Sequence, residues 1–188
     1  MKDLDPLYER FKQKLEAVSG ECFRVKTPLE ASELVKNVLL TKGINDVALV
    51  NSSITRACDL INKLTESNIQ VYTDQYRNIT PTVGCGITEI KYAIAELGTL
   101  VQFATDVNER LCSAFVPVHI ALVPTSAIIP TLMETMVVIN KEPQIPGFVG
   151  FITGPSRTSD IERVLAIGVH GPEQLIAIFV DEQVGEAA

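Results

Sequence analysis

The sequence predicts an α/β protein whose core is a mainly parallel β-sheet flanked by helices, preceded by an N-terminal helix. Short apolar runs alternate with amphipathic segments of helical length, the rhythm of β–α–β units. Serine, threonine, proline and glycine stand where such helices begin and end. With 188 residues, 46% of them hydrophobic, the chain has the size of one domain, 1–188.

The N-terminal helix is predicted over residues 3–18, within the segment 1–20. Its apolar residues recur at spacings of three and four: Leu4, Leu7, Phe11, Leu15 and Val18. Ser19 and Gly20 end it. Such a helix either packs on the domain or reaches a partner.

The next elements follow a β–α–β pattern. Thr27, Pro28 and Glu30 form a capping box with proline at the first helical position, which predicts a helix to about residue 41. A buried strand is expected at 46–50, a helix over 54–66 and a short strand at 69–72. This succession favours parallel strand pairing.

The second half is less regular. Two short strands, 92–96 and 99–103, are expected about the turn at Leu97 and Gly98. Later elements are a strand at 119–123, a helix over 129–138, a strand at 149–153, a helix over about 159–167 and a strand at 174–180. The strands at 46–50, 119–123, 149–153 and 174–180 are all expected in the parallel sheet.

Composition excludes several classes of protein. The net charge is −7, so a phosphate backbone would be repelled and nucleic-acid binding is not expected. The first residues lack the apolar core of a signal peptide, and no window reaches the length of a membrane span, so we expect a cytoplasmic protein. Four well-separated cysteines, at 22, 58, 85 and 112, offer no metal-binding pair and are expected to be buried thiols. No metal site is predicted.

The segment 154–160 is the strongest candidate for ligand binding. It follows an apolar strand, and Ser159 with Glu162 resembles a capping box that opens the next helix. Ligands bind where the carboxyl end of a strand meets the amino end of a helix. Arg157 adds a planar donor fork. We therefore expect a small anion to be bound by Gly154, Ser156, Arg157, Thr158, Ser159 and Asp160. The alternative is an ordinary helix cap.

Three other residues are candidates for chemistry. Glu96 lies among apolar residues, where burial would raise its pKa and suit it to acid–base catalysis; alternatively, N–H groups of the turn hold its carboxylate. His119 begins an apolar strand, where it is either a functional group or a hydrogen-bonded core residue. His170, in a tight turn, is a ligand contact or an exposed turn residue. A glycine pattern from Gly84 to Glu89 lacks the third glycine of a dinucleotide fingerprint.

Several stretches together resemble the lactate-utilization protein C family, the LUD domain. They are Gly86-Ile87-Thr88, residues 93–99, residues 117–120, residues 152–162 (ITGPSRTSDIE) and residues 168–172 (GVHGP). The family usually has threonine where Leu97 stands and often proline where Val118 stands. The matching stretches span about half of the chain, residues 84–180.

The resemblance implies the fold of glucosamine-6-phosphate deaminase, ribose-5-phosphate isomerase and coenzyme A transferases. It also implies a role in oxidising L-lactate beside iron–sulfur subunits, with no cofactor on this chain. Glu96 and His119 are the expected catalytic residues, and Thr88, Thr99 and His170 join the expected anion- or substrate-binding residues.

Three functions remain open at this point. The first is a non-redox subunit of an iron–sulfur lactate oxidase that contributes a small-anion site or a docking surface. The second is a self-sufficient enzyme acting on a small phosphorylated or acyl substrate, with Glu96 as base and Arg157 as clamp. The third is a ligand-sensing or assembly module without catalysis.

Overall fold

A computed structural model describes residues 4–106, 108–159, 165–167 and 171–182. The helices are α1 (Asp5–Ala17), α2 (Pro28–Thr41), α3 (Ser53–Ala57), α4 (Leu60–Glu66), α5 (Tyr76–Ile79), α6 (Leu111–Ala114) and α7 (Leu132–Ile139), with one 3₁₀ turn at Thr125–Ala127. The strands are β1 (Glu21–Val25), β2 (Asp46–Leu49), β3 (Gln70–Tyr72), β4 (Cys85–Glu89), β5 (Tyr92–Ile94), β6 (Thr99–Ala104), β7 (Val118–Pro124), β8 (Ile128–Ile129), β9 (Phe148–Ile152), β10 (Arg157–Ser159), β11 (Leu165–Ile167) and β12 (Gln174–Val180).

The core is a six-stranded sheet with the order β1-β12-β7-β4-β2-β3. Every pair in it is parallel, which confirms the predicted fold class. The predicted strand positions agree closely with β2, β3, β7 and β12, and the capping box of Thr27 and Glu30 begins α2 as expected. Strand β1, at one edge of this sheet, was not predicted, and the helix expected over 54–66 is two helices, α3 and α4.

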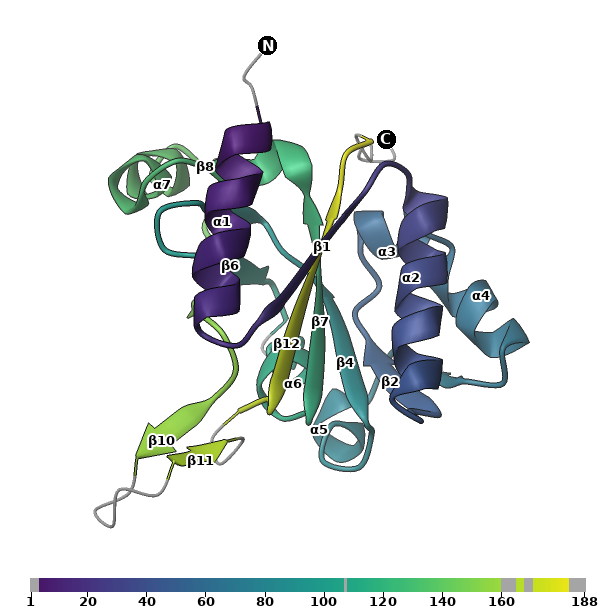
Figure 1. The fold of residues 1–188 in the computed structure, drawn as a ribbon. Helices are drawn as coiled ribbons and strands as arrows, with labels where there is room; N and C mark the ends of the chain where they lie inside the picture. The colour runs from purple at the N-terminus through teal and green to yellow at the C-terminus, as the bar shows by residue number, and fades with distance from the viewer. Residues whose placement is uncertain (1–3, 107, 160–164, 168–170, 183–188) are drawn as a thin grey trace.

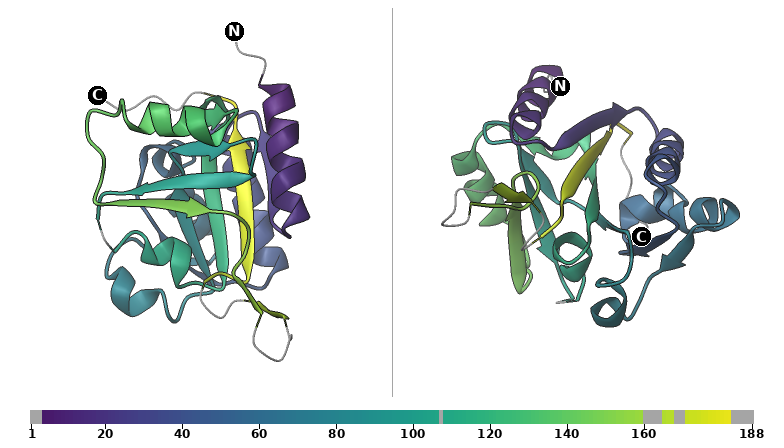
Figure 2. Two further views of the ribbon diagram at one scale, coloured as in Figure 1. Left: turned by 90° about the vertical axis from the view of Figure 1, so that its left-hand side faces the viewer. Right: turned by 60° about the horizontal axis from the view of Figure 1, so that its bottom comes forward.

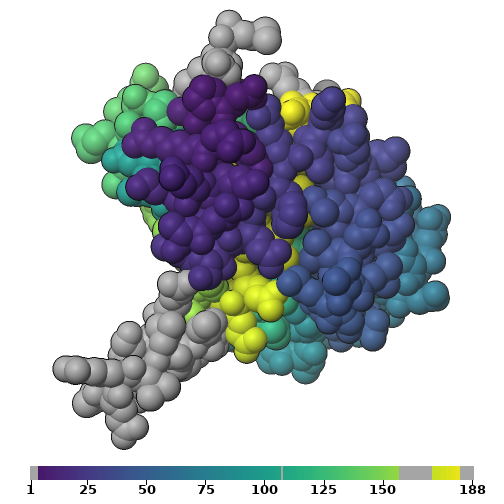
Figure 3. Space-filling model, in the orientation of Figure 1, coloured from purple at the N-terminus to yellow at the C-terminus, as the bar shows by residue number. Residues whose placement is uncertain are grey.

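Helices α2, α3 and α4 cover one face of the six-stranded sheet (Figure 1). Strand side chains alternate between the two faces. Those that point to these helices are almost all apolar and join one buried cluster: Val47, Leu49, Cys85, Ile87, Val118, Ile120, Leu122, Ile176, Ile178 and Val180. Figure 3 shows α1 and α2 on either side of the yellow β12 in the same view.

The opposite face is covered by α1, by the short helices α5 and α6, and by a second sheet with the order β8-β5-β6-β9. The strands of this second sheet run across those of the first (Figure 2). Helix α1 packs on the domain, since its Phe11 and Leu15 are fully buried and the Phe11 ring lies 5.0 Å from that of Phe179.

Two structural expectations for the chain around residues 149–167 are wrong. Strand β9 does not join the parallel sheet but pairs antiparallel with β6 in the second sheet. The helix expected over 159–167 is not formed at its two described ends, because β10 and β11 pair with each other as antiparallel strands. Apolar periodicity and a local capping pattern cannot specify a strand's partner, which here decides the structure.

These differences place residues 154–159 near the opposite end of the sheet from the one expected. The backbone N–H of Ser156 donates to the carbonyl oxygen of Pro172 at 2.8 Å, two residues before β12 begins. The described part of the segment therefore lies near the amino ends of the parallel strands. Glycine is required at position 154 for two reasons. Its φ is positive (75°), and a Cβ there would lie 2.8 Å from a methyl carbon of Val18 at the end of α1.

Candidate functional site

A pocket of about 220 Å³ lies at the carboxyl ends of β2 and β4, and we call it the strand-end pocket. Its hydroxyl and amide lining comes from Asn51, Ser52, Thr88, Gln102 and Thr105, and its charged lining from Glu89, Lys91 and Glu109. Val50 and Phe103 complete it. In open α/β sheets, ligands bind at such a carboxyl edge, where neighbouring connections diverge.

The carboxylate of Glu89 is held at the start of α3. It accepts hydrogen bonds from the Ser53 hydroxyl, at 3.0 Å to Oε2 and 3.2 Å to Oε1, and from the backbone N–H of Ile54, at 3.2 Å to Oε2. Ser52 and Thr55 form a capping box on the same helix. These bonds fix the carboxylate in position, and it retains capacity to accept further hydrogen bonds.

Thr88 and His119 form a buried polar pair between the two sheets. The Oγ1 of Thr88 lies 2.8 Å from Nε2 of His119, and the two residues are 1% and 0% exposed. Burial lowers the pKa of His119 to about 3, so the imidazole is neutral at physiological pH. Its Nδ1 has no hydrogen-bond partner among the described residues.

Gln102 and Ser113 are a second polar pair in the same layer. Gln102 lies on β6 of the second sheet, and its side-chain amide is 2.6 Å from the hydroxyl of Ser113 on α6. Both residues are buried. Helix α6 can pack this closely because β4 has glycine at position 86, where a Cβ would lie 1.8 Å from the carbonyl oxygen of Cys112.

Lys91 supplies the positive charge of the strand-end pocket. Its side chain is 41% exposed, and its ammonium nitrogen is 3.8 Å from Oε1 of Glu142, at the limit of an ion pair. Together with Glu89 and Glu109, the lining carries two carboxylates and one ammonium group. The lining therefore has a net charge of −1 and would repel a phosphate dianion more strongly than a monoanion or a neutral ligand.

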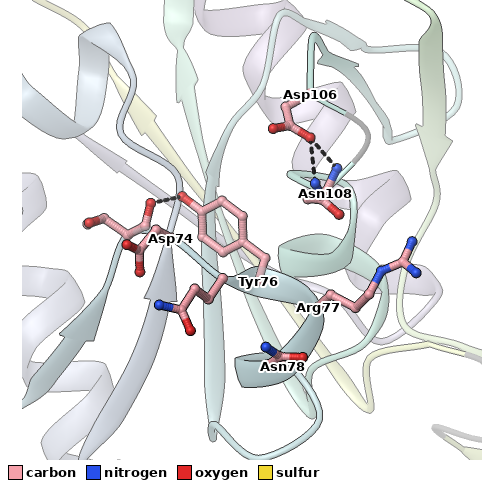
Figure 4. A pocket seen from close by; sticks show the side chains of 8 residues that line it. Asp74, Tyr76, Arg77, Asn78, Asp106 and Asn108 are labelled. Atoms are coloured by element: carbon pink, nitrogen blue, oxygen red, sulfur yellow. Dashed lines mark hydrogen bonds between the residues drawn. The ribbon is translucent and has the colours of Figure 1, made fainter.

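A second, wider pocket of about 600 Å³ is formed mainly by residues 73–78, with Asp106 and Asn108 on its other side (Figure 4). Three of its eight lining side chains, those of Tyr76, Asp106 and Asn108, form hydrogen bonds within the protein. The Tyr76 hydroxyl lies within hydrogen-bond distance of the carbonyl oxygens of Leu49 and Thr73, and Asp106 accepts from Asn108. Most of the lining is exposed. We therefore take the strand-end pocket as the candidate site.

Of the predicted site residues that the structure describes, it brings Thr88 and His119 together and places the others elsewhere. Glu96 is half-buried, and its carboxylate accepts from the backbone N–H of Leu132 at 3.0 Å, at the start of α7. The carboxylate is thus held by a backbone N–H group, as in the alternative considered above, but the donor belongs to α7 and not to the turn at Leu97 and Gly98. The hydroxyl of Thr99 is 2.6 Å from that of Thr153. Neither Glu96 nor Thr99 lines the strand-end pocket.

The predicted anion-binding segment has a different setting from the one expected. Arg157, Thr158 and Ser159 form β10, which pairs with β11. Gly154 and Ser156 precede this hairpin. Asp160 and His170 lie outside the described residues. Ser159 is in a strand and does not begin a helix as expected, and anion binding through Arg157 stays a prediction.

Sequence reasoning missed most of the strand-end pocket. Asn51 and Ser52 directly follow the predicted strand 46–50, so their position after a parallel strand was a usable signal. Glu89 was noted only as a departure from a glycine pattern. Gln102 and Lys91 come into the pocket through the crossing of the two sheets, for which the local sequence has no signal.

The four cysteines are free and buried, as expected. Burial raises the pKa of every thiol, to about 11 for Cys58 and about 12 for Cys22 and Cys112. In the described part of the chain, no three side chains of histidine, cysteine, aspartate or glutamate are grouped so that they could hold a metal ion. Among the same residues, no helix is long and apolar enough to span a membrane.

The fold and the pocket define an α/β protein with a polar pocket at the carboxyl ends of a parallel sheet. The sequence profile of the LUD domain matches residues 8–180, and the chain belongs to this family. The crystal structure of a DUF162 family protein from Deinococcus radiodurans has the same fold, with a TM-score of 0.65 and 16% identity over 96% of this chain and 99% of that one.

Curated relatives in the family are named lactate utilization proteins. Lactate utilization protein C 1 of Bacillus mycoides is 38% identical over 102 residues, which cover 52% of this chain and 44% of the relative. Lactate utilization protein C of Anoxybacillus flavithermus is 27% identical over 179 residues, covering 90% and 81%. The more similar of these two thus matches over less than half of its own length.

Proposed function

We propose that the chain acts in lactate utilization as a non-redox subunit of an L-lactate-oxidising system. In this proposal, partner subunits hold the iron–sulfur clusters, and this chain contributes a small-ligand site. The observation that carries the proposal is the LUD match over residues 8–180, together with relatives named lactate utilization protein C.

The chemistry of the chain supports the non-redox part of the proposal. Iron–sulfur clusters are held by thiolates, which must converge on one point. Each of the four cysteines is buried, and burial favours the neutral thiol. They belong to three different buried clusters, with Cys58 and Cys85 the only two that share one. The chain therefore has hydrogen-bonding and charged groups to offer a substrate, and electron transfer is assigned to its partners.

The strand-end pocket is the best-supported place for the small-ligand site. It combines a buried polar floor with fixed charged groups at the carboxyl edge of the sheet. The segment that includes Arg157 is the alternative place, near the amino edge. Arg157→Ala and Lys91→Met distinguish them, since each removes the cation from one candidate site and leaves the other intact.

Deletion and complementation in the source organism test the proposed function. We expect the deletion strain to lose growth on L-lactate and to grow normally on pyruvate, which enters metabolism after the oxidation. Affinity purification of the tagged chain should recover iron-containing partners. Normal growth of the deletion strain on L-lactate would contradict the proposal, as would oxidation of L-lactate by the purified chain alone with a dye as electron acceptor.

A further inference from the structure

We propose that the strand-end pocket binds a small 2-hydroxy carboxylate, with Lys91 facing its carboxylate, Glu89 accepting a hydrogen bond from its hydroxyl, and Thr88 donating one. This assignment rests on the proposed function for its biological setting. The site itself is argued from the arrangement of the pocket, and it can be tested on the purified chain.

The volume of the pocket limits the ligand to a small molecule. Liquid water occupies about 30 Å³ per molecule, so a pocket of about 220 Å³ has the volume of roughly seven waters. A three- or four-carbon acid fits this space.

The charges limit the ligand to at most one negative charge. Glu89 and Glu109 would repel a second one, and Lys91 would exchange its 3.8 Å contact with Glu142 for the carboxylate of the ligand. Glu89 cannot move away easily, because Ser53 and the backbone of Ile54 hold it. Its Oε1 has only the longer contact to the Ser53 hydroxyl, at 3.2 Å, so this oxygen can accept from a ligand hydroxyl.

Oε1 of Glu89 distinguishes a hydroxy acid from the corresponding oxo acid. A hydroxyl group can donate to a carboxylate, whereas a keto oxygen carries no proton and would face the negative charge of Glu89. A hydrogen bond to a charged group changes affinity by roughly 10- to 150-fold. We therefore expect the hydroxy acid to bind at least about tenfold more tightly than its oxo counterpart.

His119 acts on this site through Thr88 and is a positioning residue. Its Nε2 contacts the Thr88 hydroxyl, and its Nδ1 has no partner in the described structure. An orphaned N–H in the interior is rarer than an unused acceptor, which favours the tautomer with the proton on Nε2. The imidazole then donates to Thr88 Oγ1, and the Thr88 hydroxyl proton is free for a ligand.

Gln102 provides the remaining fixed contact. One polar atom of its side-chain amide is used by Ser113 at 2.6 Å, and its other polar atom makes no hydrogen bond within the described residues. Gln102 is only 2% exposed and lines the pocket, so the proposal assigns the unused atom to the ligand. An unpaired amide atom in such a place gains a partner when a polar ligand enters.

Isothermal titration calorimetry on the purified full chain tests the assignment, with L-lactate, pyruvate and inorganic phosphate as probes. We expect L-lactate to bind at least about tenfold more tightly than pyruvate, and phosphate to bind weakest. Lys91→Met should weaken L-lactate binding by about tenfold or more. Glu89→Gln should reduce the preference for L-lactate over pyruvate. Lys141→Met, at an exposed lysine that does not line the pocket, and Arg157→Ala should leave both affinities unchanged.

A double-mutant cycle isolates the role of His119. We expect Thr88→Val and His119→Gln each to weaken L-lactate binding, and His119→Gln to have little further effect in the Thr88→Val background. Fully additive losses would contradict positioning through Thr88. Urea unfolding of each variant verifies that it is folded at the temperature of the titration.

Three outcomes would overturn the proposal: no L-lactate binding, equal affinity in the parent and Lys91→Met, or loss of binding in Arg157→Ala alone. Failure here is distinguishable from failure of the proposed function. L-lactate binding with normal growth of the deletion strain refutes the role in lactate oxidation only. Loss of growth on L-lactate without L-lactate binding refutes the ligand assignment only.

Discussion

The two faces of the six-stranded sheet differ in the chemistry of their buried side chains. Toward α2, α3 and α4, the strands present an almost unbroken apolar surface, interrupted at the end of β4 by Glu89. Toward α1, α6 and the second sheet, the strands β4 and β7 also carry Thr88 and His119, and β6 adds Gln102. The same sheet thus has one face built for packing and one face with a polar interior.

Because the two faces differ in this way, substitutions on them should differ in their effects on protein stability and on ligand binding. Burying a polar group costs free energy unless the group is hydrogen-bonded. The buried polar layer contains polar atoms without a partner among the described residues, so these atoms lower the stability of the fold. The apolar residues of the helix-covered face have no such cost and stabilise the fold through apolar burial. We therefore expect substitutions of the apolar residues on the helix-covered face to change stability alone, and substitutions on the polar face to change ligand binding as well.

The largest effect is expected for Leu122→Ala on the helix-covered face. Leu122 lies on the central strand β7 and is fully buried. Truncation should lower the free energy of unfolding by about 2–5 kcal/mol. Leu40→Ala, at a site that is 51% exposed, should change it by less than about 0.5 kcal/mol. Urea unfolding measures both. A change in L-lactate affinity of the folded Leu122 variant would break the separation of the two faces.

Gly86→Ala tests whether the close packing of α6 against the backbone of β4 holds the polar face in place. Its new Cβ would overlap the carbonyl oxygen of Cys112, so α6 must shift and take Ser113 away from Gln102. We expect a loss of about 3 kcal/mol of stability, together with weaker L-lactate binding. Gly147→Ala is the matched control, because a Cβ there meets no atom within 4 Å. Unchanged affinity in Gly86→Ala would show that α6 does not hold the pocket floor in place.

The buried imidazole of His119 makes stability depend on pH. Its pKa is about 3 in the folded protein and has the ordinary value of 6.5 in the unfolded chain, so below pH 6.5 the unfolded chain takes up a proton that the folded chain does not. The stability contribution is therefore present above pH 6.5 and is lost as pH falls. Between pH 7 and pH 5, the parent should lose about 2 kcal/mol more than His119→Gln. Equal losses in urea unfolding would contradict a neutral, desolvated histidine.

The sequence predicted the parts of the fold that local pattern determines. The runs at 46–50, 119–123 and 174–180 are apolar because their strands are buried on both faces, and each corresponds to a strand of the parallel sheet. Strand β1 was missed because its residues, ECFRV, are mostly half-buried at an edge and carry charged side chains. Edge strands lack the continuous apolar signal on which such a prediction depends.

The site was less predictable than the fold, because it depends on contacts between the two sheets. Thr88 and His119 were expected among the site residues, and their 2.8 Å contact brings them together. Gln102 was not expected, since it enters through β6 and the antiparallel pairing with β9, a strand whose apolar pattern had predicted a place in the parallel sheet. Long-range pairing, which no local pattern encodes, selects which polar residues meet.

The smallest effect is expected at Glu96, which the sequence suggested as a general base. Its carboxylate accepts from the N–H of Leu132 at the positive end of α7, so Glu96→Ala should lower the free energy of unfolding by about 1 kcal/mol. Glu96→Gln keeps an acceptor oxygen and should cost less. Because Glu96 does not line the strand-end pocket, both variants should bind L-lactate normally and support growth on it. If Glu96→Gln instead abolished growth on L-lactate while the protein stayed folded, a catalytic role for this carboxylate would stand, and the chemistry would lie at the start of α7.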